Sequence, residues 1–510
     1  MWKTRLALIL VAIAAIRIAS TYTIFSEGID EPVHLAAGLQ IFQEHRYNVQ
    51  TGNPPLPRFL FALGPWLDGM RLDKFDLRIH QRPSFVFQSG KGHRRTLALS
   101  RVGNLVFFLI AAVATLSWAR REAGDAAALA TVFFFTTQPV VLGWSGLIAQ
   151  DIAGTAGVAV SLLAFTRWLE KPSMARAIGV GAAYGFAIAC KFSCLPYVPV
   201  ACLALIAVRM VAAKRWLLDR RTLATMAVAP VATAIVIWAS YGFSWGSAIQ
   251  GAVRIGSVPA PRFVEGVLQM VLINRRGIES YLWGRTSTTG WWWYFPATLA
   301  LKSTLAFLTI VMAGFFLRPP RIFFEATAAA AAILAVAMTS TLDVGIRYVV
   351  PVFVPLSVAA GVALFRLWEQ RAAALRFAAV AVIAWQAGAS AMAHPDYFPY
   401  FNALAGQDPS RYLADSNLDW GQDAFRLASG ARHLKIPRLG IAIFSNVDLQ
   451  SLRLPPFYRP NGFDRGSGWI AVSDQIYRIE GSDGAWRWLT GRPYRRVGKS
   501  IRLYFIGGQQ

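Results

Sequence analysis

Two neighbouring carboxylates, Asp30 and Glu31, directly follow the first long apolar run of the sequence. His34 comes about one helical turn later, within the stretch EGIDEPVHLAAGLQIF at residues 27–42. A carboxylate can act as a general base that deprotonates or positions an attacking hydroxyl. Asp is also a favoured N-cap residue, so Asp30 has a structural alternative as the start of a helix. The pair is a candidate reaction centre whose role depends on its surroundings.

The elements that must position this pair are those of a membrane protein. Of the 510 residues, 55% are hydrophobic. Several apolar runs approach about 20 residues, the length of a helix that crosses a bilayer. The first run follows Lys3 and Arg5, contains Arg17 and lacks a clear cleavage site, which predicts an uncleaved span. The sequence therefore predicts a polytopic α-helical membrane protein.

The formal net charge of +24 has two explanations, nucleic-acid binding and membrane topology. The basic segments lie between hydrophobic runs, and they share one side of the membrane when spans are counted in order. This distribution is typical of short cytoplasmic loops, so we expect no nucleic-acid partner. These segments are residues 119–124, 213–221, 317–321 and 365–376.

Counting from a cytoplasmic N-terminus gives about eleven transmembrane helices, with the C-terminus on the opposite side. The predicted spans are residues 6–25, 97–118, 125–143, 152–169, 175–190, 194–211, 222–242, 294–316, 323–341, 347–366 and 375–393. The cysteines, Cys190, Cys194 and Cys202, lie in or beside these spans without a metal-binding or disulfide pattern, which predicts core packing.

Two long outer loops, residues 26–96 and 244–293, interrupt this series of spans. In the first loop, Leu35, Leu39 and Phe42 recur at helical spacing, which predicts an amphipathic helix on the membrane surface. These loops and the spans make up a predicted transmembrane catalytic domain at residues 1–393.

The composition changes after residue 393, where the chain becomes polar and is punctuated by Gly and Pro. Short runs typical of strands occur there, and a helical pattern precedes them. We therefore expect a small extracytoplasmic α/β domain at residues 394–510. Its predicted elements are a helix at 421–434 and strands at 439–444, 468–473 and 501–506.

Several further charged residues share the outer face with the acidic pair. Asp151 starts the fourth span, Lys191 ends the fifth, and Arg347 and Tyr348 begin the tenth. Charges in membrane segments are costly and are usually functional. The map therefore predicts an active site at the outer water–lipid boundary, where a lipid-linked sugar phosphate is a suitable substrate. Cations or a divalent metal would stabilise its departing phosphate.

The stretch IDEPVHLAAGLQIFQEHRYNVQTGNPPLPRFLFALG resembles the first outer loop of the bacterial GT-C glycosyltransferases, which include protein O-mannosyltransferase-like enzymes and lipid A aminoarabinose transferases. TTQPVVLGWSGLIAQDIAGT resembles their next segment. HPDYFPYFNALAG and DSNLDWGQD resemble a bacterial subgroup with a C-terminal periplasmic domain. The resemblance implies a GT-C fold in a bacterial inner membrane, with the active site on the periplasmic side.

The resemblance also implies roles for individual residues. Asp30 matches the catalytic acid and becomes the preferred base, Glu31 is its partner in shaping the site or binding a metal, and Asp151 matches a second acid. Asn53 stands where relatives have His or Glu-Lys, and Val33 and His34 stand where some have Arg-Tyr. Binding of the substrate phosphate is then expected from Lys191, Arg347 or Arg58, and His34 and Tyr348 complete the expected substrate-binding residues.

The implied reaction is sugar transfer from a polyprenyl-phosphate donor to a glycan, lipid or protein acceptor. A divalent metal held by Asp30, Glu31 and Asp151 is an open alternative, and no nucleotide cofactor is expected. Two other functions stay open: a transporter or flippase of lipid-linked sugars, and a scaffold that uses its outer domain. The motif DSNLDWGQD departs from an EF-hand, because position 12 is Arg426 rather than Glu.

Overall fold

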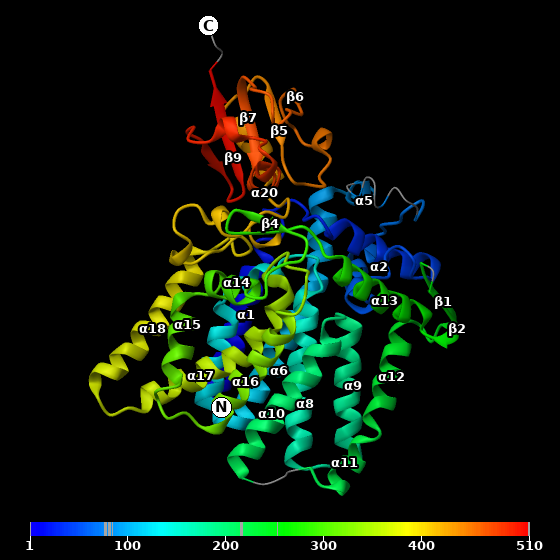
Figure 1. Ribbon diagram of the computed structural model, residues 1–510, viewed down its shortest axis with the longest axis vertical. Coiled ribbons are helices and arrows are strands. Elements are labelled where there is room, and N and C mark those ends of the chain that lie inside the picture. The colour runs from blue at the N-terminus through cyan, green and yellow to red at the C-terminus, as the bar shows by residue number, and fades with distance from the viewer. Residues whose placement is uncertain are drawn as a thin grey trace.

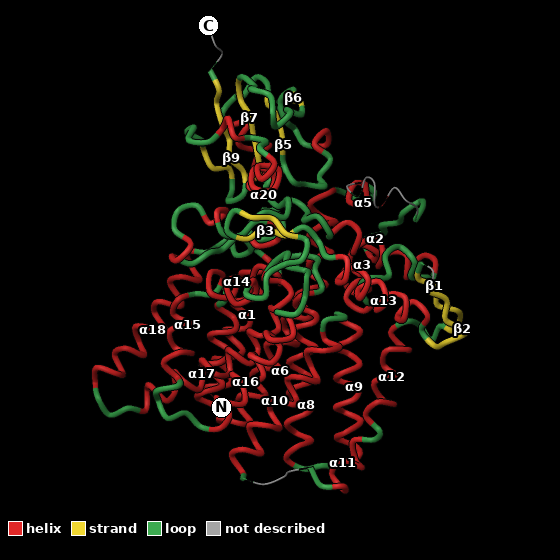
Figure 2. Tube along the Cα trace, in the orientation of Figure 1, coloured by secondary structure: helices red, strands yellow, loops and turns green. Residues whose placement is uncertain are grey.

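The computed structural model describes residues 2–75, 79, 83, 85–214, 218–251 and 253–507. Parts of the predicted loop 26–96 and residues 215–217 of the basic segment 213–221 lie outside this description. The long helices form a bundle at one end of the molecule, and a small sheet stands at the other (Figure 1). Short helices and loops fill the layer between them (Figure 2).

Helices account for the bundle and for most of the intermediate layer. They are α1 (Trp2–Ala19), α2 (Glu31–Glu44), α3 (Pro55–Leu67), α5 (Phe85–Gln88), α6 (His93–Thr137), α7 (Pro139–Ser145), α8 (Asp151–Glu170), α9 (Met174–Cys190), α10 (Cys194–Ala213), α11 (Arg220–Met226), α12 (Ala229–Ser240), α13 (Pro261–Arg276), α14 (Tyr294–Lys302), α15 (Leu305–Gly314), α16 (Arg321–Ala337), α17 (Phe353–Glu369), α18 (Ala373–Met392), α19 (Ala424–His433) and α20 (Asp474–Ile479). Short 3-10 turns, among them η1 (Ile346–Val352), join several of them.

Every predicted span contains helix, but several helices are broken. Gly124 has non-helical dihedral angles inside α6, so that this segment consists of two helices. The axes of α14 and α15 differ by 112°. Within the described ranges, six helices are long and apolar enough to cross a membrane, or seven if that bent pair is one span. The chain is a multi-pass membrane protein, and the count of eleven spans stays a prediction.

Small residues let the helices of the bundle approach closely. Gly103 of α6 faces the backbone of Leu60 in α3, and Gly361 of α17 faces the backbone of Thr131 in α6. A methyl group at either glycine would overlap those backbone atoms. Close packing through small residues is the usual way in which helices associate in a bilayer, where the hydrophobic effect does not drive association.

The structure corrects the prediction of a surface helix in the first outer loop. The helix itself exists as α2, with Leu35 and Leu39 buried as expected. However, Ala36, Ala37 and Gln40 are buried as well, so that most of the helix surface is covered. The helix packs against α3, and Gly38 contacts the backbone of Arg58. The helix is an internal element of the intermediate layer rather than one with a single buried face.

The region after α18 contains a five-stranded sheet, which we name the tail sheet. Its strand order is β6-β5-β7-β9-β8; β5 is parallel to β6 and β7, and β9 is antiparallel to β7 and β8. Strands and the helix α19 occur at the predicted positions. The strands are β5 (Leu439–Ala442), β6 (Phe457–Tyr458), β7 (Gly468–Ser473), β8 (Arg495–Val497) and β9 (Ile501–Ile506).

Two short hairpins lie in the second outer loop, residues 244–293. The first is built from β1 (Trp245–Gln250) and β2 (Val253–Pro259), and the second from β3 (Ser280–Leu282) and β4 (Arg285–Ser287). The second hairpin contacts the region after α18, because Trp283 N–H donates to the carbonyl of Tyr412 at 3.0 Å. This outer loop therefore connects the bundle with the chain that leads to the tail sheet.

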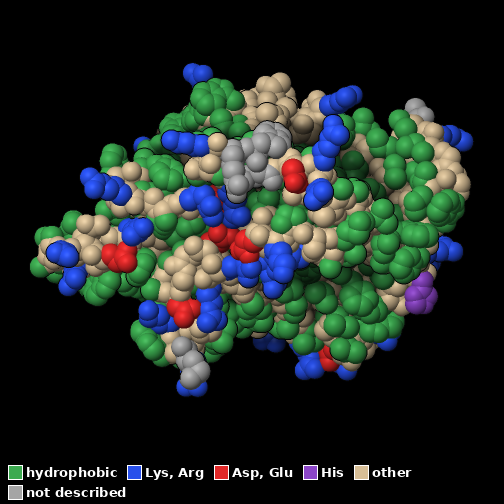
Figure 3. Space-filling view, turned by 90° about the horizontal axis from the view of Figure 1, so that it is seen from below, with side chains coloured by type: hydrophobic (Ala, Val, Ile, Leu, Met, Phe, Trp, Pro, Cys, Tyr) green, Lys and Arg blue, Asp and Glu red, His purple; other side chains and the backbone are tan. Residues whose placement is uncertain are grey.

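The end of the bundle opposite the tail sheet carries many basic side chains. Seen from that end, Lys and Arg side chains are spread among hydrophobic ones, with few acidic side chains between them (Figure 3). Such a surface is typical of the cytoplasmic ends of membrane helices. The predicted orientation, with the tail sheet on the outer side of the membrane, stays a prediction.

Gly103→Ala tests the close contact between α3 and α6. The added methyl group would force the two helices apart, and overpacking of this kind costs about 1–3 kcal/mol. We expect a lower midpoint of thermal unfolding in detergent. Gly179→Ala in α9 is the matched control, because a methyl group there meets open space. Equal midpoints for the two variants would contradict the close packing.

Candidate active site

A cavity of about 620 Å³ lies where the helix bundle meets the intermediate layer. Its polar end is formed by Asp30, Asp151, Lys191 and Arg347. These residues come from four separate segments: the start of α2, the start of α8, the end of α9 and the 3-10 turn η1. The structure thus brings together residues that the sequence analysis placed on one face.

Asp30 stands at the N-cap position of α2 but does not act as a side-chain cap. Within the described part of the chain, its carboxylate makes no capping hydrogen bond to the helix. Instead, Oδ2 accepts a hydrogen bond from Nη1 of Arg347 at 2.8 Å, and 41% of the side chain is exposed. Because Asp30 lines the cavity, its carboxylate is available to a bound molecule.

The charge of Arg347 controls the ionisation of Asp30. Burial raises the pKa of this carboxyl, but the positive charge of Arg347, supported by other nearby basic groups, outweighs burial and holds the pKa below its usual value. Asp30 is therefore an anion at neutral pH. Loss of Arg347 would leave the effect of burial on this pKa less strongly opposed.

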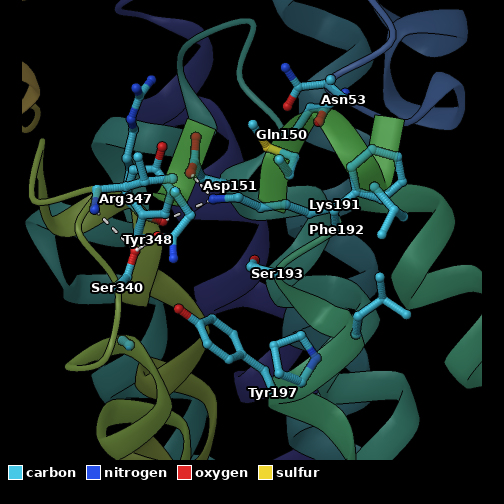
Figure 4. Close-up of a pocket in the computed structure, with 18 of the residues that line it drawn as sticks. Asn53, Gln150, Asp151, Lys191, Phe192, Ser193, Tyr197, Ser340, Arg347 and Tyr348 are labelled. Carbon is cyan, nitrogen blue, oxygen red and sulfur yellow. Dashed lines mark hydrogen bonds and ion pairs between the residues drawn. The ribbon is translucent and has the colours of Figure 1, made fainter. Parts of the chain in front are cut away.

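A second ion pair lies beside the first. Asp151 is the first residue of α8, and its Oδ1 accepts a hydrogen bond from Nζ of Lys191 at 2.5 Å. Nζ also donates to the backbone carbonyl of Arg347 at 3.3 Å. Lys191 thereby links α8 to the turn that carries Arg347. Figure 4 shows Asp151, Lys191 and Arg347 side by side on one wall of the cavity.

Aromatic rings support the two cations. Tyr348 places its ring 5.0 Å from Nζ of Lys191 and 5.5 Å from the guanidinium carbon of Arg347. Trp420 lies 5.6 Å from the same guanidinium carbon. Cation–π contacts of this kind favour a charged group in partly desolvated surroundings. Tyr348 also lines the cavity.

His34 lines the cavity as a neutral imidazole. Burial and the neighbouring charge of Arg58 lower the pKa of His34 to about 3. Nε of Arg58 donates to Nδ1 of His34 at 3.0 Å, so the ring proton is assigned to Nε2. His34 can donate a hydrogen bond to a ligand, but it does not carry the charge that would attract a phosphate.

The expectation that Arg58 binds the substrate phosphate is not supported by its position. Arg58 is fully buried and, among the described residues, is absent from the cavity wall. Its guanidinium donates to His34, to the hydroxyl of Tyr47 at 2.6 Å and to the carbonyl and side chain of Gln50. Its position is that of a residue that orients His34 from behind.

Glu31 also lies behind the cavity wall. Its two oxygens accept hydrogen bonds from Arg101 at 3.0 and 2.7 Å, and both side chains are 0% exposed. The same carboxylate accepts from the backbone N–H of Ile148 at 2.6 Å and of Gly28 at 2.7 Å. Glu31 therefore joins α2 to α6 and to the loop before α8, in a supporting position.

The acids do not form a metal site in this arrangement. Asp30, Glu31 and Asp151 are each paired with a different cation, namely Arg347, Arg101 and Lys191. Across the described ranges, no group of three or more His, Cys, Asp and Glu side chains is arranged to hold a metal ion. The described acids therefore do not fit a metal site.

The cavity wall also carries two polar residues that the sequence did not single out, Gln150 and Ser193. Gln150 Oε1, Ser193 Oγ and Arg347 Nε are buried atoms for which the described part of the protein offers no hydrogen-bond partner. All three residues contribute to the cavity wall. Gln150 precedes Asp151, and Ser193 follows Lys191 by two positions. The only signal in the sequence for Gln150 and Ser193 was their position near the predicted charged residues Asp151 and Lys191.

Most of the remaining lining is apolar; the polar exceptions are Asn53, Asn274, Arg275, Thr339 and Ser340. Figure 4 shows Tyr197 projecting into the cavity from α10, away from the ion pairs. Helices α10, α13 and α16 contribute further apolar lining residues, namely Leu195, Pro196, Val267, Met270, Val271, Val336 and Ala337. The cavity therefore suits a molecule with an anionic end and a hydrocarbon end.

Comparisons with known proteins agree with this architecture. Residues 96–238 match the model of the dolichyl-phosphate-mannose-protein mannosyltransferase family. This match includes Asp151 and Lys191 and covers less than half of the chain. A comparison with curated proteins finds no match.

Solved structures extend the likeness over the whole chain. ArnT from Cupriavidus metallidurans bound to undecaprenyl phosphate has a TM-score of 0.53 at 14% identity, covering 99% of this chain and 99% of that one. This chain therefore has the fold of ArnT. Apo ArnT from the same organism has a TM-score of 0.50 at 14% identity, with 100% coverage of both chains. The Archaeoglobus fulgidus oligosaccharyltransferase gives a TM-score of 0.49 at 13% identity, covering 93% of this chain and 71% of that one.

The buried pair of Glu31 and Arg101 can be tested by its contribution to stability. Glu31→Gln would leave Arg101 buried without its counter-charge, which costs about 3–5 kcal/mol for a buried pair. We expect a clearly lower midpoint of thermal unfolding. Glu369→Gln is the control, because its pair with Arg366 is exposed on both sides, at 42% and 39%. An unchanged midpoint for Glu31→Gln would contradict the supporting role.

Proposed function

We propose that the protein transfers a sugar from a polyprenyl-phosphate-linked donor to an acceptor hydroxyl at the periplasmic face of a bacterial inner membrane. The observation that carries this proposal is the two-ended cavity, with ion pairs at one end and apolar residues at the other. A polyprenyl phosphate has the same two-ended character. The fold shared with ArnT, whose structure contains undecaprenyl phosphate, supports this choice of carrier.

In this proposal, Arg347 and Lys191 bind the phosphate of the donor. Nε of Arg347 has no partner within the described residues, and the ammonium of Lys191 makes hydrogen bonds only to Asp151 and to one carbonyl there, although it carries three donors. Both groups stabilise the negative charge that develops on the phosphate as the bond to the sugar breaks. His34, with its proton on Nε2, supplies a neutral donor nearby.

Asp30 acts as the general base. Its carboxylate accepts the proton of the acceptor hydroxyl while the hydroxyl oxygen attacks the anomeric carbon and the phosphate leaves. In the ligand-free pair, Arg347 lowers the basicity of Asp30. Once Arg347 turns its charge to the donor phosphate, the pKa of Asp30 rises, because burial then dominates. Donor binding thereby activates the base.

The polar surroundings also suit the remaining parts of the reaction. Asp151 keeps Lys191 in place and stands close enough to compete with the phosphate for its charge. Residues 394–507 form the described part of the proposed periplasmic domain, and the tail sheet stands at the end of the molecule opposite the long helices (Figure 1). A glycan, lipid or protein acceptor would approach Asp30 from this side.

Asp30→Asn tests the proposed base. The amide keeps the shape of the side chain but cannot accept the proton, so we expect a loss of about 10²–10⁴-fold in kcat. Purified protein in proteoliposomes would be given a polyprenyl-phosphate sugar, and its consumption would be measured together with movement across the bilayer. Asp68→Asn, in the surface pair with Arg95, is the matched control.

Two outcomes would contradict the proposal. Full activity of Asp30→Asn would remove Asp30 as the base. Movement of the lipid-linked sugar across the bilayer without its consumption, in the wild-type protein, would instead indicate the alternative function, a flippase.

The pH dependence gives an independent test of the Asp30–Arg347 pair. Activity that needs the carboxylate falls as the pH drops through the pKa of Asp30, which Arg347 holds low. In Arg347→Gln, burial is less strongly opposed, so the acidic limb of kcat/KM against pH should move to higher pH. Arg95→Gln, a surface variant, should leave the limb in place. An unmoved limb in Arg347→Gln would mean that Arg347 does not control the base.

A further inference from the structure

The motif DSNLDWGQD, residues 415–423, finds no role in the reaction as described. We name it the tail motif. It lies between α18 and α19, in the chain that leads from the bundle to the tail sheet. Nearly all of it is buried, with Asn417 at 0% and Trp420 at 3% exposure. Buried polar groups are normally hydrogen-bonded, so the partners of this motif show which parts of the protein it holds in place.

The first half of the tail motif makes hydrogen bonds to the backbone just before Arg347. Oδ1 of Asn417 accepts a hydrogen bond from the backbone N–H of Ile346 at 2.9 Å. The hydroxyl of Ser416 donates to the carbonyl of Val344. Ile346 directly precedes Arg347, so these bonds fix the point from which the Arg347 side chain departs.

The second half of the tail motif makes hydrogen bonds to the segment just before Asp30. The backbone N–H of Ile29 donates to the carbonyl of Trp420 at 3.1 Å, and that of Ser26 donates to the carbonyl of Gln422 at 3.0 Å. The hydroxyl of Ser26 donates to the carbonyl of Gly421 at 2.8 Å. Ile29 directly precedes Asp30, so the other member of the ion pair is fixed by the same short motif.

The indole of Trp420 connects the two halves. Its ring lies 5.6 Å from the guanidinium carbon of Arg347. On the other side, the ring contacts Gly28 so closely that a methyl group there would overlap it. Trp420 therefore occupies the space between the Arg347 side chain and the segment before Asp30. A smaller side chain would leave both free to shift.

The tail motif is itself anchored on both sides. Nδ2 of Asn417 donates to the hydroxyl of Tyr294 in α14 at 2.8 Å. Asp423 accepts hydrogen bonds from the backbone N–H groups of Lys499 at 2.9 Å and Ser500 at 3.1 Å, just before β9. The backbone N–H of Gln475, after β7, donates to Asp419 at 3.2 Å. Displacement of the tail sheet would therefore disturb the motif.

We propose that Asn417 and Trp420 are positioning residues that set the separation of Asp30 and Arg347, so that the active site is complete only when the tail motif is seated. The kinetic part of this inference rests on the proposed function; the geometric part does not. The ion pair joins residues 317 positions apart in the chain. Because one short motif is hydrogen-bonded to the backbone before each residue, it fixes the positions of the two residues relative to each other.

The test uses Asn417→Leu and Trp420→Phe in the full-length protein. Asn402→Leu is the matched control, because Asn402 is also buried and donates to the carbonyls of Ala300 at 2.6 Å and Ser303 at 2.8 Å, away from the ion pair. Hydrogen–deuterium exchange is measured first, without substrate. We expect faster exchange in peptides that contain residues 344–348 and 26–30 for both variants, but not for Asn402→Leu.

The kinetic arm follows on the same proteins. Misplacement of reacting groups costs up to about 100-fold, so we expect a 10- to 100-fold fall in kcat with a smaller change in KM. The acidic limb of the pH profile should also move to higher pH, as the pair with Arg347 weakens. A residue that only stabilises the fold would lower the melting midpoint without moving this limb.

The outcomes separate the two proposals. Exchange at residues 344–348 and 26–30 that matches the control in both variants would overturn the positioning role, whatever the activity. Faster exchange with unchanged kcat and an unmoved acidic limb would also overturn it. Faster exchange in a protein whose wild type consumes no lipid-linked sugar would keep the geometric inference and reject the proposed function.

Discussion

The site depends on the pairing of charges at the boundary between the helix bundle and the intermediate layer. Asp30, Asp151 and Glu31 each face one cation, Arg347, Lys191 and Arg101 respectively. Burial of an ionised group costs desolvation free energy, and pairing with an opposite charge offsets part of this cost. Each pair joins segments far apart in the chain, so forming the pairs also assembles the cavity. The two pairs formed by Asp30 and Asp151 line the cavity, whereas the Glu31–Arg101 pair lies behind its wall.

The charged residues of the site form two layers, one that lines the cavity and one that lies behind it. Arg347 and Lys191 retain hydrogen-bonding capacity toward the cavity, beside the unmet polar atoms of Gln150 and Ser193. Behind them, Arg58 uses its donors on His34, Tyr47 and Gln50, and Arg101 uses its donors on Glu31 and nearby carbonyls. A rigid support allows the inner groups to be held in place before the substrate arrives, which is a requirement for electrostatic stabilisation of developing charge.

Much of the site was predictable because charges within apolar segments stand out. Alternation of the spans placed Asp30, Asp151, Lys191 and Arg347 on one face, and the structure gathers them around one cavity. The roles of Glu31 and Arg58 could not be separated from these, because a sequence does not show that Arg101 or His34 lies opposite. The helix α2 was found from its spacing, but the cover on its other faces comes from distant segments. The contacts of Asn417 and Trp420 could not be predicted either, because their partners also lie in distant segments of the chain.

The central claim is that the ion pairs of the ligand-free site open to receive a lipid-linked phosphate. The most direct measurement is a cryo-electron microscopy structure of the protein in lipid nanodiscs with a polyprenyl phosphate bound. The account predicts the phosphate within hydrogen-bonding distance of Arg347 and Lys191, the hydrocarbon chain along the apolar end of the cavity, and Asp30 released from Arg347. A phosphate bound elsewhere, or bound while Asp30 and Arg347 stay paired, would contradict it.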